Sequence, residues 1–173
     1  MNPLPTAQNL KLMGFDVDGV LSDGRLYYCD DGSEIKTFNT LDGHGMKMLR
    51  DAGIEIAIIT GRRSGAVEAR ARNLGIDLLF QAVEDKKDVM AGILAKRGLT
   101  FAEAGYMGDD VVDLPIMRAC GFAAAPANAH ALVKEHSHLV TTLRGGKGAA
   151  REVCEAILAA QGKLDAALAR YLA

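Results

Sequence analysis

The sequence predicts a doubly wound α/β fold with a mainly parallel sheet. Short apolar segments of strand length alternate with segments of helical length along almost the whole chain, a pattern typical of parallel strands joined by crossover helices. The 173 residues, of which 49% are hydrophobic and 24% charged, suit one domain with a sizeable core. We therefore expect a single domain over residues 1–173 whose sheet is covered by helices on both faces.

The first half of the chain begins with a strand and a hairpin. The apolar segment 11–17 predicts the first strand. Residues 25–29 and 34–38 flank an Asp30-Asp31-Gly32 turn, which predicts a β-hairpin flap over about 24–39. The following segments predict, in order, a helix over 43–53, a buried strand over 54–60, a helix over 64–75 with Ser64 as its N-cap, and a strand over 76–81.

The second half continues the alternation. It predicts, in order, a helix over 85–98, a strand over 103–108, a short helix over 110–121, a strand over 121–126, a helix over 128–137, a last core strand over 138–142, and a closing helix and tail over about 147–173. The tail itself, residues 162–173, is compatible with a helix or a frayed end. In such folds ligands bind beyond the carboxyl ends of the strands. The residues just after each strand are therefore the candidates for a functional site.

The composition gives no sign of a nucleic-acid or membrane partner. The net charge is -2, and no apolar run approaches the roughly 20 residues of a membrane span. The N-terminus lacks the basic start and long apolar run of a signal peptide. Cys29, Cys120 and Cys154 are far apart and odd in number, which favours reduced thiols in a cytoplasmic protein.

Polar residues that suit phosphate chemistry follow four of the predicted strands. Asp16 and Asp18 end the first strand, and Asp109 ends a later one. Thr60 ends the buried Ile-rich strand, and Lys86 begins a helix. Carboxylates alone would repel a phosphate, whereas a Mg²⁺ ion held by oxygen ligands would bridge the two. The set therefore predicts Mg²⁺-dependent phosphoryl transfer.

This chemistry gives each of these side chains a role. Asp16 and Asp109 supply oxygen ligands to Mg²⁺, and Asp16 attacks phosphorus to form an aspartyl-phosphate. Asp18 protonates the leaving oxygen and then deprotonates the attacking water. Thr60 and Lys86 hold the phosphoryl oxygens and offset their charge.

Neighbouring residues leave alternatives open. Gly19 and Gly61 lack side chains, so the backbone can come close to the phosphate there. Lys87 is a rival for the lysine that precedes it. Asp110 and Asp113 either cap the short helix near Pro115 or contact the substrate or the waters of the metal.

The order of these motifs resembles that of the haloacid dehalogenase superfamily. Asp16-x-Asp18-Gly19, Thr60, Lys86 and Gly108-Asp109-Asp110 follow one another as they do there, and the resemblance runs from about residue 11 to the last core strand. It implies a Rossmann-like sheet. Because the phosphatases of the superfamily have the second aspartate and its dehalogenases lack it, the resemblance also implies a phosphatase. It further implies that Asp18 gives a backbone carbonyl to Mg²⁺.

The stretches between the motifs are too short for the cap domain that most members of that superfamily carry. Either a macromolecular substrate or a neighbouring subunit must then cover the site. Residues 24–47, 59–76 and 145–167 closely resemble the 3-deoxy-D-manno-octulosonate 8-phosphate phosphatases, a capless family. This resemblance implies a homotetramer, with the hairpins in a central barrel and each site covered by a neighbour. It also implies a hydrolase of lipopolysaccharide inner-core biosynthesis.

The same resemblance assigns residues to the sugar-acid substrate. Arg62 can pair bidentately with a carboxylate, and Lys47 and Arg70 match further family positions. Asp18, Gly61 and Lys86 complete the substrate site near the phosphate. The substrate loop of the family matches Asn39, Thr40, Leu41, Asp42 and Gly43. That loop often has Arg or Gln where Leu41 stands, which bears on the identity of the sugar.

Three other functions remain open on the sequence alone. The same scaffold suits a phosphatase for a nine-carbon sugar acid 9-phosphate. An open site without a cap suits a phosphatase for proteins or nucleic acids. A non-catalytic regulatory partner would have no need of the complete set Asp16, Asp18, Thr60, Lys86 and Asp109, so this set favours an enzyme.

Overall fold

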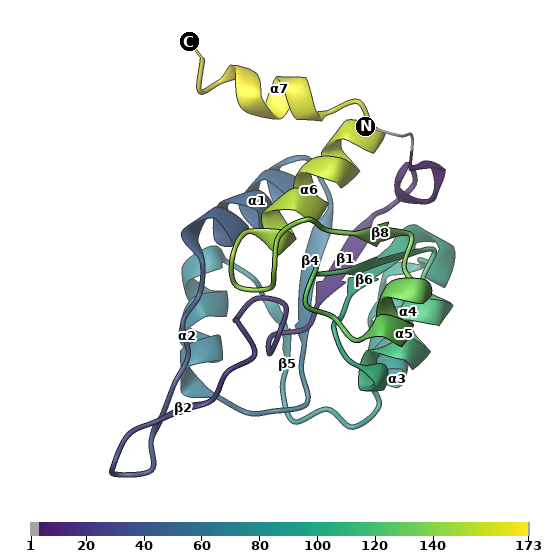
Figure 1. The fold of residues 1–173 in the computed structure, drawn as a ribbon. Coiled ribbons are helices and arrows are strands. Elements are labelled where there is room, and N and C mark those ends of the chain that lie inside the picture. Colours follow the sequence, from purple (N-terminus) through teal and green to yellow (C-terminus); the bar gives the residue numbers. More distant parts are fainter. Residues whose placement is uncertain (1–3, 173) are drawn as a thin grey trace.

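The computed structural model describes residues 4–172 and confirms the α/β class. Within these residues six parallel strands form one sheet in the order β5-β4-β1-β6-β7-β8 (Figure 1). The strands are β1 Leu12–Phe15, β4 Glu55–Ile59, β5 Leu78–Phe80, β6 Ala104–Met107, β7 Phe122–Ala125 and β8 Leu139–Val140. The strand that carries the first motif, β1, lies between β4 and β6. The residues after these three strands therefore meet at one edge of the sheet.

Helices cover both faces of the sheet (Figure 1). They are α1 Thr40–Asp51, α2 Gly65–Leu74, α3 Lys86–Arg97, α4 Leu114–Ala119, α5 Ala131–Glu135 and α6 Ala149–Ala160. A further helix, α7 Leu164–Ala169, follows α6 and lies away from the sheet (Figure 1). Short 3-10 helices span Pro5–Ala7, Phe101–Glu103 (η2) and Val111–Asp113 (η3). Within the described part of the chain, no helix combines the length and the apolar character that crossing a membrane requires.

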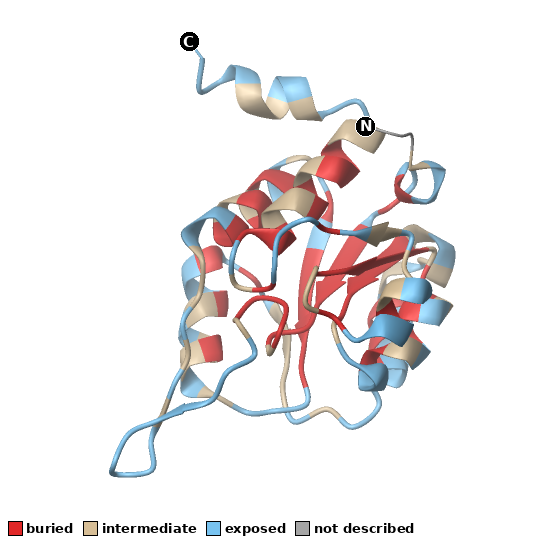
Figure 2. Ribbon diagram, viewed as in Figure 1, coloured by how far each residue is buried: buried red, intermediate tan, exposed pale blue. Residues whose placement is uncertain are grey.

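Two hydrophobic clusters lie on opposite faces of the sheet, whose central strands are mostly buried (Figure 2). Met13 and Phe15 of β1 belong to the cluster with α1, α2 and α6, whereas Leu12 belongs to the cluster with α3 and α4. Successive side chains of a strand point to opposite faces, so each central strand contributes to both clusters. The free thiols Cys120 and Cys154 are buried.

The predicted hairpin is present but short. Strands β2 Tyr27–Tyr28 and β3 Glu34–Ile35 pair antiparallel. The turn between them is closed by hydrogen bonds from the Cys29 N–H to the Ser33 oxygen and from the Gly32 N–H to the Cys29 oxygen, both 2.9 Å long. This flap, residues 24–39, projects from the sheet (Figure 1). Cys29 at its turn is exposed and free.

The predicted start of α1 was wrong. Helix α1 begins at Thr40 rather than at residue 43, because the Asn39 side chain accepts a hydrogen bond from the Leu41 N–H at 2.8 Å and caps the helix. The predicted substrate loop is therefore the first helical turn. Ser64 lies at the N-cap position of α2, as predicted, although its side chain makes no capping hydrogen bond.

Candidate active site

A cavity of about 400 Å³ lies at the carboxyl edge of the central strands. It is lined by the motif residues that follow β1, β4, β5 and β6. The predicted site residues that line it are Asp16, Asp18, Thr60, Gly61, Arg62, Lys86 and Asp109. Residues that are separated by more than ninety positions in the sequence thus meet in one place, as expected for the strand ends of a parallel sheet.

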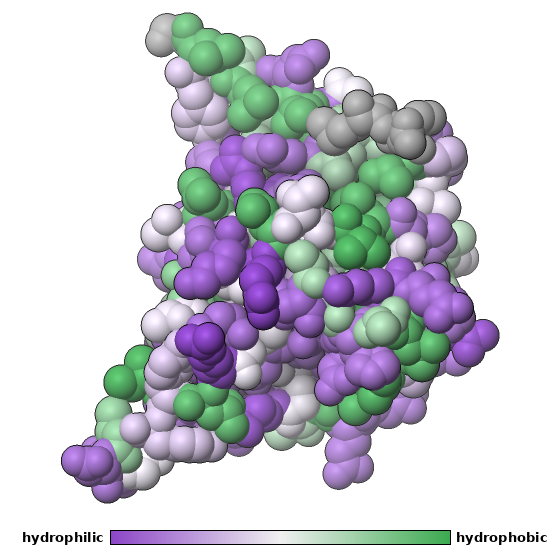
Figure 3. Space-filling model, viewed as in Figure 1, coloured by the Kyte–Doolittle hydropathy of each residue, from purple (hydrophilic) through white to green (hydrophobic). Residues whose placement is uncertain are grey.

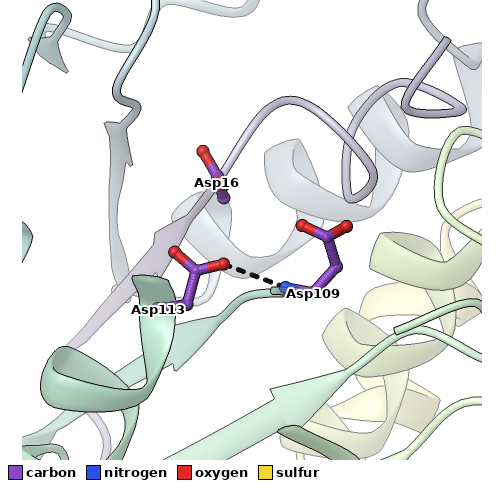
Figure 4. Close-up of side chains that lie close together, drawn as sticks. All are labelled: Asp16, Asp109 and Asp113. Atoms are coloured by element: carbon purple, nitrogen blue, oxygen red, sulfur yellow. Dashed lines mark hydrogen bonds between the residues drawn. The ribbon is translucent and has the colours of Figure 1, made fainter. Parts of the chain in front are cut away.

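Three carboxylates cluster at this edge of the sheet (Figure 4). Asp16 follows β1, Asp109 follows β6, and Asp113 ends η3; one oxygen from each lies within 4.8 Å of the others. Burial, with the negative charge of Asp113 next, raises the pKa of Asp16 to about 6 and that of Asp109 to about 7. Closely spaced, partly desolvated carboxylates favour a bound hard cation, and oxygen ligands of this kind suit Mg²⁺.

Lys86 is the lysine that reaches the cluster. Its Nζ lies 2.9 Å from Asp16 Oδ2 and 2.6 Å from Asp113 Oδ1, whereas Lys87 is exposed. Burial alone would lower the pKa of Lys86, but Asp16 and Asp113 outweigh this effect and raise it. The ammonium group is therefore charged at neutral pH. The Asp85 side chain accepts a hydrogen bond from the Asp88 N–H and caps α3. This cap makes Lys86 the first residue of the helix.

Asp113 helps to cap η3, which is the first of the two roles that the sequence left open. Its Oδ2 accepts hydrogen bonds from the N–H groups of Asp109 at 3.0 Å and Asp110 at 3.3 Å, while its Oδ1 pairs with Lys86. Its side chain is fully buried. Asp110 caps η3 by accepting from the Val111 N–H, and it also lines the cavity. Asp113 thus holds the loop of Asp109 in place.

The loop after β1 is held by residues from the far end of the sequence. Gly19 has a φ of +84°, and a side chain there would overlap the Asp109 carboxylate. The Asn128 side chain donates to the Gly19 oxygen at 3.0 Å and accepts from the Gly145 N–H at 2.6 Å. Gly145 itself packs directly against the Gly19 oxygen. The Gly145–Gly148 segment therefore supports the loop after β1 of its own chain.

Asp18 faces the flap rather than the acidic cluster. Its Oδ1 forms an ion pair with Lys36, and its Oδ2 lies 3.7 Å from the Nε of Arg62. Both cations also pair with Glu34 of β3. The sequence analysis missed Glu34 and Lys36, since a polar hairpin carries no signal that it folds back onto a strand end.

The remaining predicted substrate residues lie elsewhere on the chain. Lys47 and Arg70 line a separate depression of about 170 Å³, together with Thr40 and Gly43 at the start of α1. Arg70 donates to the Asn39 oxygen at 2.9 Å. Leu41 is exposed on the first turn of α1.

Asp42 makes structural contacts instead. Its carboxylate accepts hydrogen bonds from the backbone N–H groups of Gly148 at 3.3 Å and Arg151 at 2.9 Å, where α6 begins. Within one chain these residues and the cavity residues therefore form two separate groups.

No family model matches the chain, but curated proteins and solved structures do. The chain is 44% identical over 161 residues to the 3-deoxy-D-manno-octulosonate 8-phosphate phosphatase KdsC of Escherichia coli (strain K12), covering 93% of this chain and 86% of that protein. A probable YrbI family phosphatase from Pseudomonas syringae pv. phaseolica shares 54% identity with a TM-score of 0.96, over 98% of this chain and 97% of that one.

A second solved structure carries ligands. It is a 3-deoxy-D-manno-octulosonate 8-phosphate phosphatase from Moraxella catarrhalis in complex with a magnesium ion, a phosphate ion and a KDO molecule. That chain is 42% identical to this one with a TM-score of 0.95, and 97% of each chain is covered.

Proposed function

Since the chain belongs to the family of 3-deoxy-D-manno-octulosonate 8-phosphate phosphatases, we propose that it is a single-domain phosphoric monoester hydrolase acting on that ester. The products are the free sugar acid and phosphate, and the pathway is lipopolysaccharide inner-core biosynthesis in the cytoplasm. The observation that carries the proposal is the meeting of Asp16, Asp18, Thr60, Lys86 and Asp109 in one cavity.

The cofactor of this reaction is Mg²⁺. Asp16 and Asp109 would hold the ion with their carboxylates and Asp18 with its backbone carbonyl, while Asp113 positions the loop of Asp109. The donor set is all oxygen, and burial, with repulsion between the carboxylates next, raises the pKa values of Asp16 and Asp109, both of which a bound cation would oppose. When bound, Mg²⁺ offsets the charge of the phosphate and draws electron density from its oxygens.

The chain's own residues account for both chemical steps. An oxygen of Asp16 forms a bond to phosphorus as the bond from phosphorus to the sugar oxygen breaks, and Asp18 gives its proton to that oxygen. Water then attacks the aspartyl-phosphate and gives a proton back to Asp18, which frees Asp16 and releases phosphate. Lys86 and Thr60 bind the phosphoryl oxygens throughout.

Arg62 is the proposed partner of the sugar carboxylate. Its side chain is 45% exposed and lines the cavity beside Gly61. A guanidinium presents two parallel N–H donors that match a carboxylate. In this structure one of its nitrogens pairs with the carboxylate of Glu34, which supports a role of Arg62 in carboxylate binding.

The site is completed in a homotetramer. The flap exposes apolar side chains, Leu26, Tyr28 and Ile35 among them, and Figure 3 shows hydrophobic surface along the flap behind a hydrophilic tip. Such an apolar surface favours association with a second copy. The depression with Lys47 and Arg70 would then contribute to the site of a neighbouring subunit.

The test is phosphate release from 3-deoxy-D-manno-octulosonate 8-phosphate, with Mg²⁺ and with EDTA. We expect release that requires the metal. Nine-carbon sugar acid 9-phosphates are the comparison, because Leu41 replaces a residue that is often Arg or Gln. Preference for a nine-carbon acid would keep the mechanism and change the substrate, whereas no release from any of these esters by folded, metal-loaded protein would overturn the proposal.

A further inference from the structure

Lys36 is partly buried, although it lies on the flap. Its side chain is only 2% exposed, whereas the flap residues Tyr28 and Ile35 are more than half exposed. Taking an ammonium group out of water is unfavourable by several kcal/mol unless ion pairs and hydrogen bonds compensate for the lost hydration. The flap therefore places Lys36 where a specific set of anionic partners holds it.

Those partners form a compact group of four charges. Lys36 pairs with Asp18 Oδ1 and lies 2.8 Å from Glu34 Oε1. Arg62 pairs with Glu34 Oε2 and lies 3.7 Å from Asp18 Oδ2. Two cations and two anions alternate, so the group is neutral, and it joins the loop after β1, the flap and the segment after β4. Of the four, Asp18 and Arg62 line the cavity.

The two carboxylate oxygens of Asp18 have different partners in this group. Oδ1 accepts from Lys36, and the Ser22 hydroxyl is 3.5 Å away. Oδ2 accepts no hydrogen bond from residues 4–172. Its ion-pair partner, the Nε of Arg62, lies farther from Oδ2 than the Nζ of Lys36 lies from Oδ1. One oxygen is thus fixed and the other is available for proton transfer.

We propose that Lys36 is a positioning residue for Asp18, and that Glu34 holds Lys36 in place. The ammonium group fixes Oδ1 and so directs Oδ2 at the reacting oxygens. This inference rests on the proposed function, in which Asp18 is the general acid and base. It makes the flap of the same chain part of the catalytic arrangement, in addition to any cover that a neighbour supplies.

Two esters with different leaving groups distinguish a misplaced general acid from a general loss of catalytic activity. A sugar alkoxide is a poor leaving group and needs the proton of Asp18 as its bond to phosphorus breaks. The p-nitrophenolate ion leaves without a proton. The ratio kcat/KM reports the steps up to the first irreversible one, which here is formation of the aspartyl-phosphate. A misplaced acid therefore lowers kcat/KM for the sugar ester and spares that for p-nitrophenyl phosphate.

The experiment measures kcat/KM of wild type and Lys36→Met on both esters with saturating Mg²⁺. We expect the substitution to lower kcat/KM for the sugar ester by about tenfold to a hundredfold more than kcat/KM for the aryl ester. This loss is a part of the roughly 10²- to 10⁴-fold rate increase that general acid catalysis contributes. Lys36→Arg, which keeps a cation, should recover most of the loss. Lys96→Met, at an exposed lysine of α3, is the matched control and should match wild type.

The outcomes are distinct. Equal losses on both esters, or an unchanged or increased preference for the sugar ester, would overturn the positioning role. If Lys36→Met does not fold, as judged by circular dichroism, then Glu34→Gln tests the same group and should shift the preference in the same direction by a smaller factor. A wild-type protein that hydrolyses neither sugar acid ester would instead overturn the proposed function.

Discussion

Asp16 and Asp18 are two residues apart, yet the fold gives their carboxylates different surroundings. Asp16 is buried beside Lys86 and the other two carboxylates of the cluster. Asp18 lies beside the flap, with Lys36 and Arg62 as its partners. Two carboxyl groups with different environments can take different roles in one reaction. This separation supports a nucleophile and an acid–base residue within a single turn of chain.

At Asp16, the nucleophilic role predicts that Asp16→Asn abolishes turnover. The amide has the same shape, but its oxygen is a poor nucleophile and it carries no charge for Mg²⁺ or Lys86. Phosphate release from the sugar ester is the measurement. Asp77→Asn, at an exposed position, is the control and should keep full activity. Turnover by the folded Asp16→Asn variant would contradict covalent catalysis.

The carboxylate cluster predicts a pH-dependent stabilisation by Mg²⁺. Burial and mutual repulsion raise the pKa values of Asp16 and Asp109 from 3.8 to about 6 and about 7. Between pH 4 and 7 the folded state therefore binds more protons than the unfolded state, so without metal these groups lower the stability as the pH rises. Above pH 7 they are ionised and ready for Mg²⁺.

The increase in Tm on adding Mg²⁺ to EDTA-treated protein should thus be larger at pH 8 than at pH 5.5. Binding at a hundred times Kd corresponds to about 2.7 kcal/mol. Asp109→Asn should remove most of the increase at pH 8. An increase that is the same at both pH values, or that survives in Asp109→Asn, would place the metal elsewhere.

At the scale of elements, the contact between α1 and α6 explains an unusual helix. Two glycines, Gly43 and Gly45, lie in the first half of α1 and are buried. Gly45 packs against α6, where a Cβ atom would lie 3.0 Å from the Arg151 Cα and 2.9 Å from its Cδ. Close packing therefore requires glycine at a position where helix propensity disfavours it by about 1 kcal/mol.

Two alanine substitutions should therefore have opposite effects on stability. Gly92→Ala in α3 meets no atom within 4 Å and should raise the free energy of unfolding by up to about 1 kcal/mol. Gly45→Ala gains the same propensity but forces α1 away from the backbone of α6, so it should lower the free energy of unfolding. Urea denaturation of both variants is the measurement. Stabilisation by Gly45→Ala would show that the interface yields easily.

The same helix shows what the sequence could and could not predict at this scale. The order of strands and helices follows from apolar segments and the breaks between them, and the structure confirms it. The start of α1 was placed three residues late, because the resemblance assigned residues 39–43 to a substrate loop and the Asn39 cap depends on the path of the chain before it. The strands of the flap are two residues each, since little of the hairpin packs against the sheet.

At the scale of the whole molecule, the cavity and the depression with Lys47 and Arg70 are two separate parts of one proposed site. Motif residues after the strands were predictable because the topology of a parallel sheet brings strand ends together. The contacts of Lys36, Glu34 and Asp113 were not, because they depend on how the flap and η3 fold back over the sheet edge. The distribution of site residues over subunits stays a proposal.

The proposed assembly predicts a linked loss of tetramer and substrate affinity. Ile35→Lys places a charge on the exposed apolar surface of the flap and should convert a tetramer to smaller species in sedimentation velocity. The KM for the sugar ester should rise, because the residues from the neighbour are lost. Val140→Lys, at an exposed site on the edge strand β8, is the control. A wild-type monomer with full activity would contradict the assembly.

The packing of Gly145 against the oxygen of Gly19 has a consequence for synthesis of the protein. The loop that carries the proposed nucleophile is made early, but its support comes from Asn128 and Gly145, which leave the ribosome more than a hundred residues later. Strand β1 also needs β6 as a neighbour. A nascent chain therefore has no formed catalytic loop until most of its length has emerged, and fragments truncated before Gly145 lack the support of that loop.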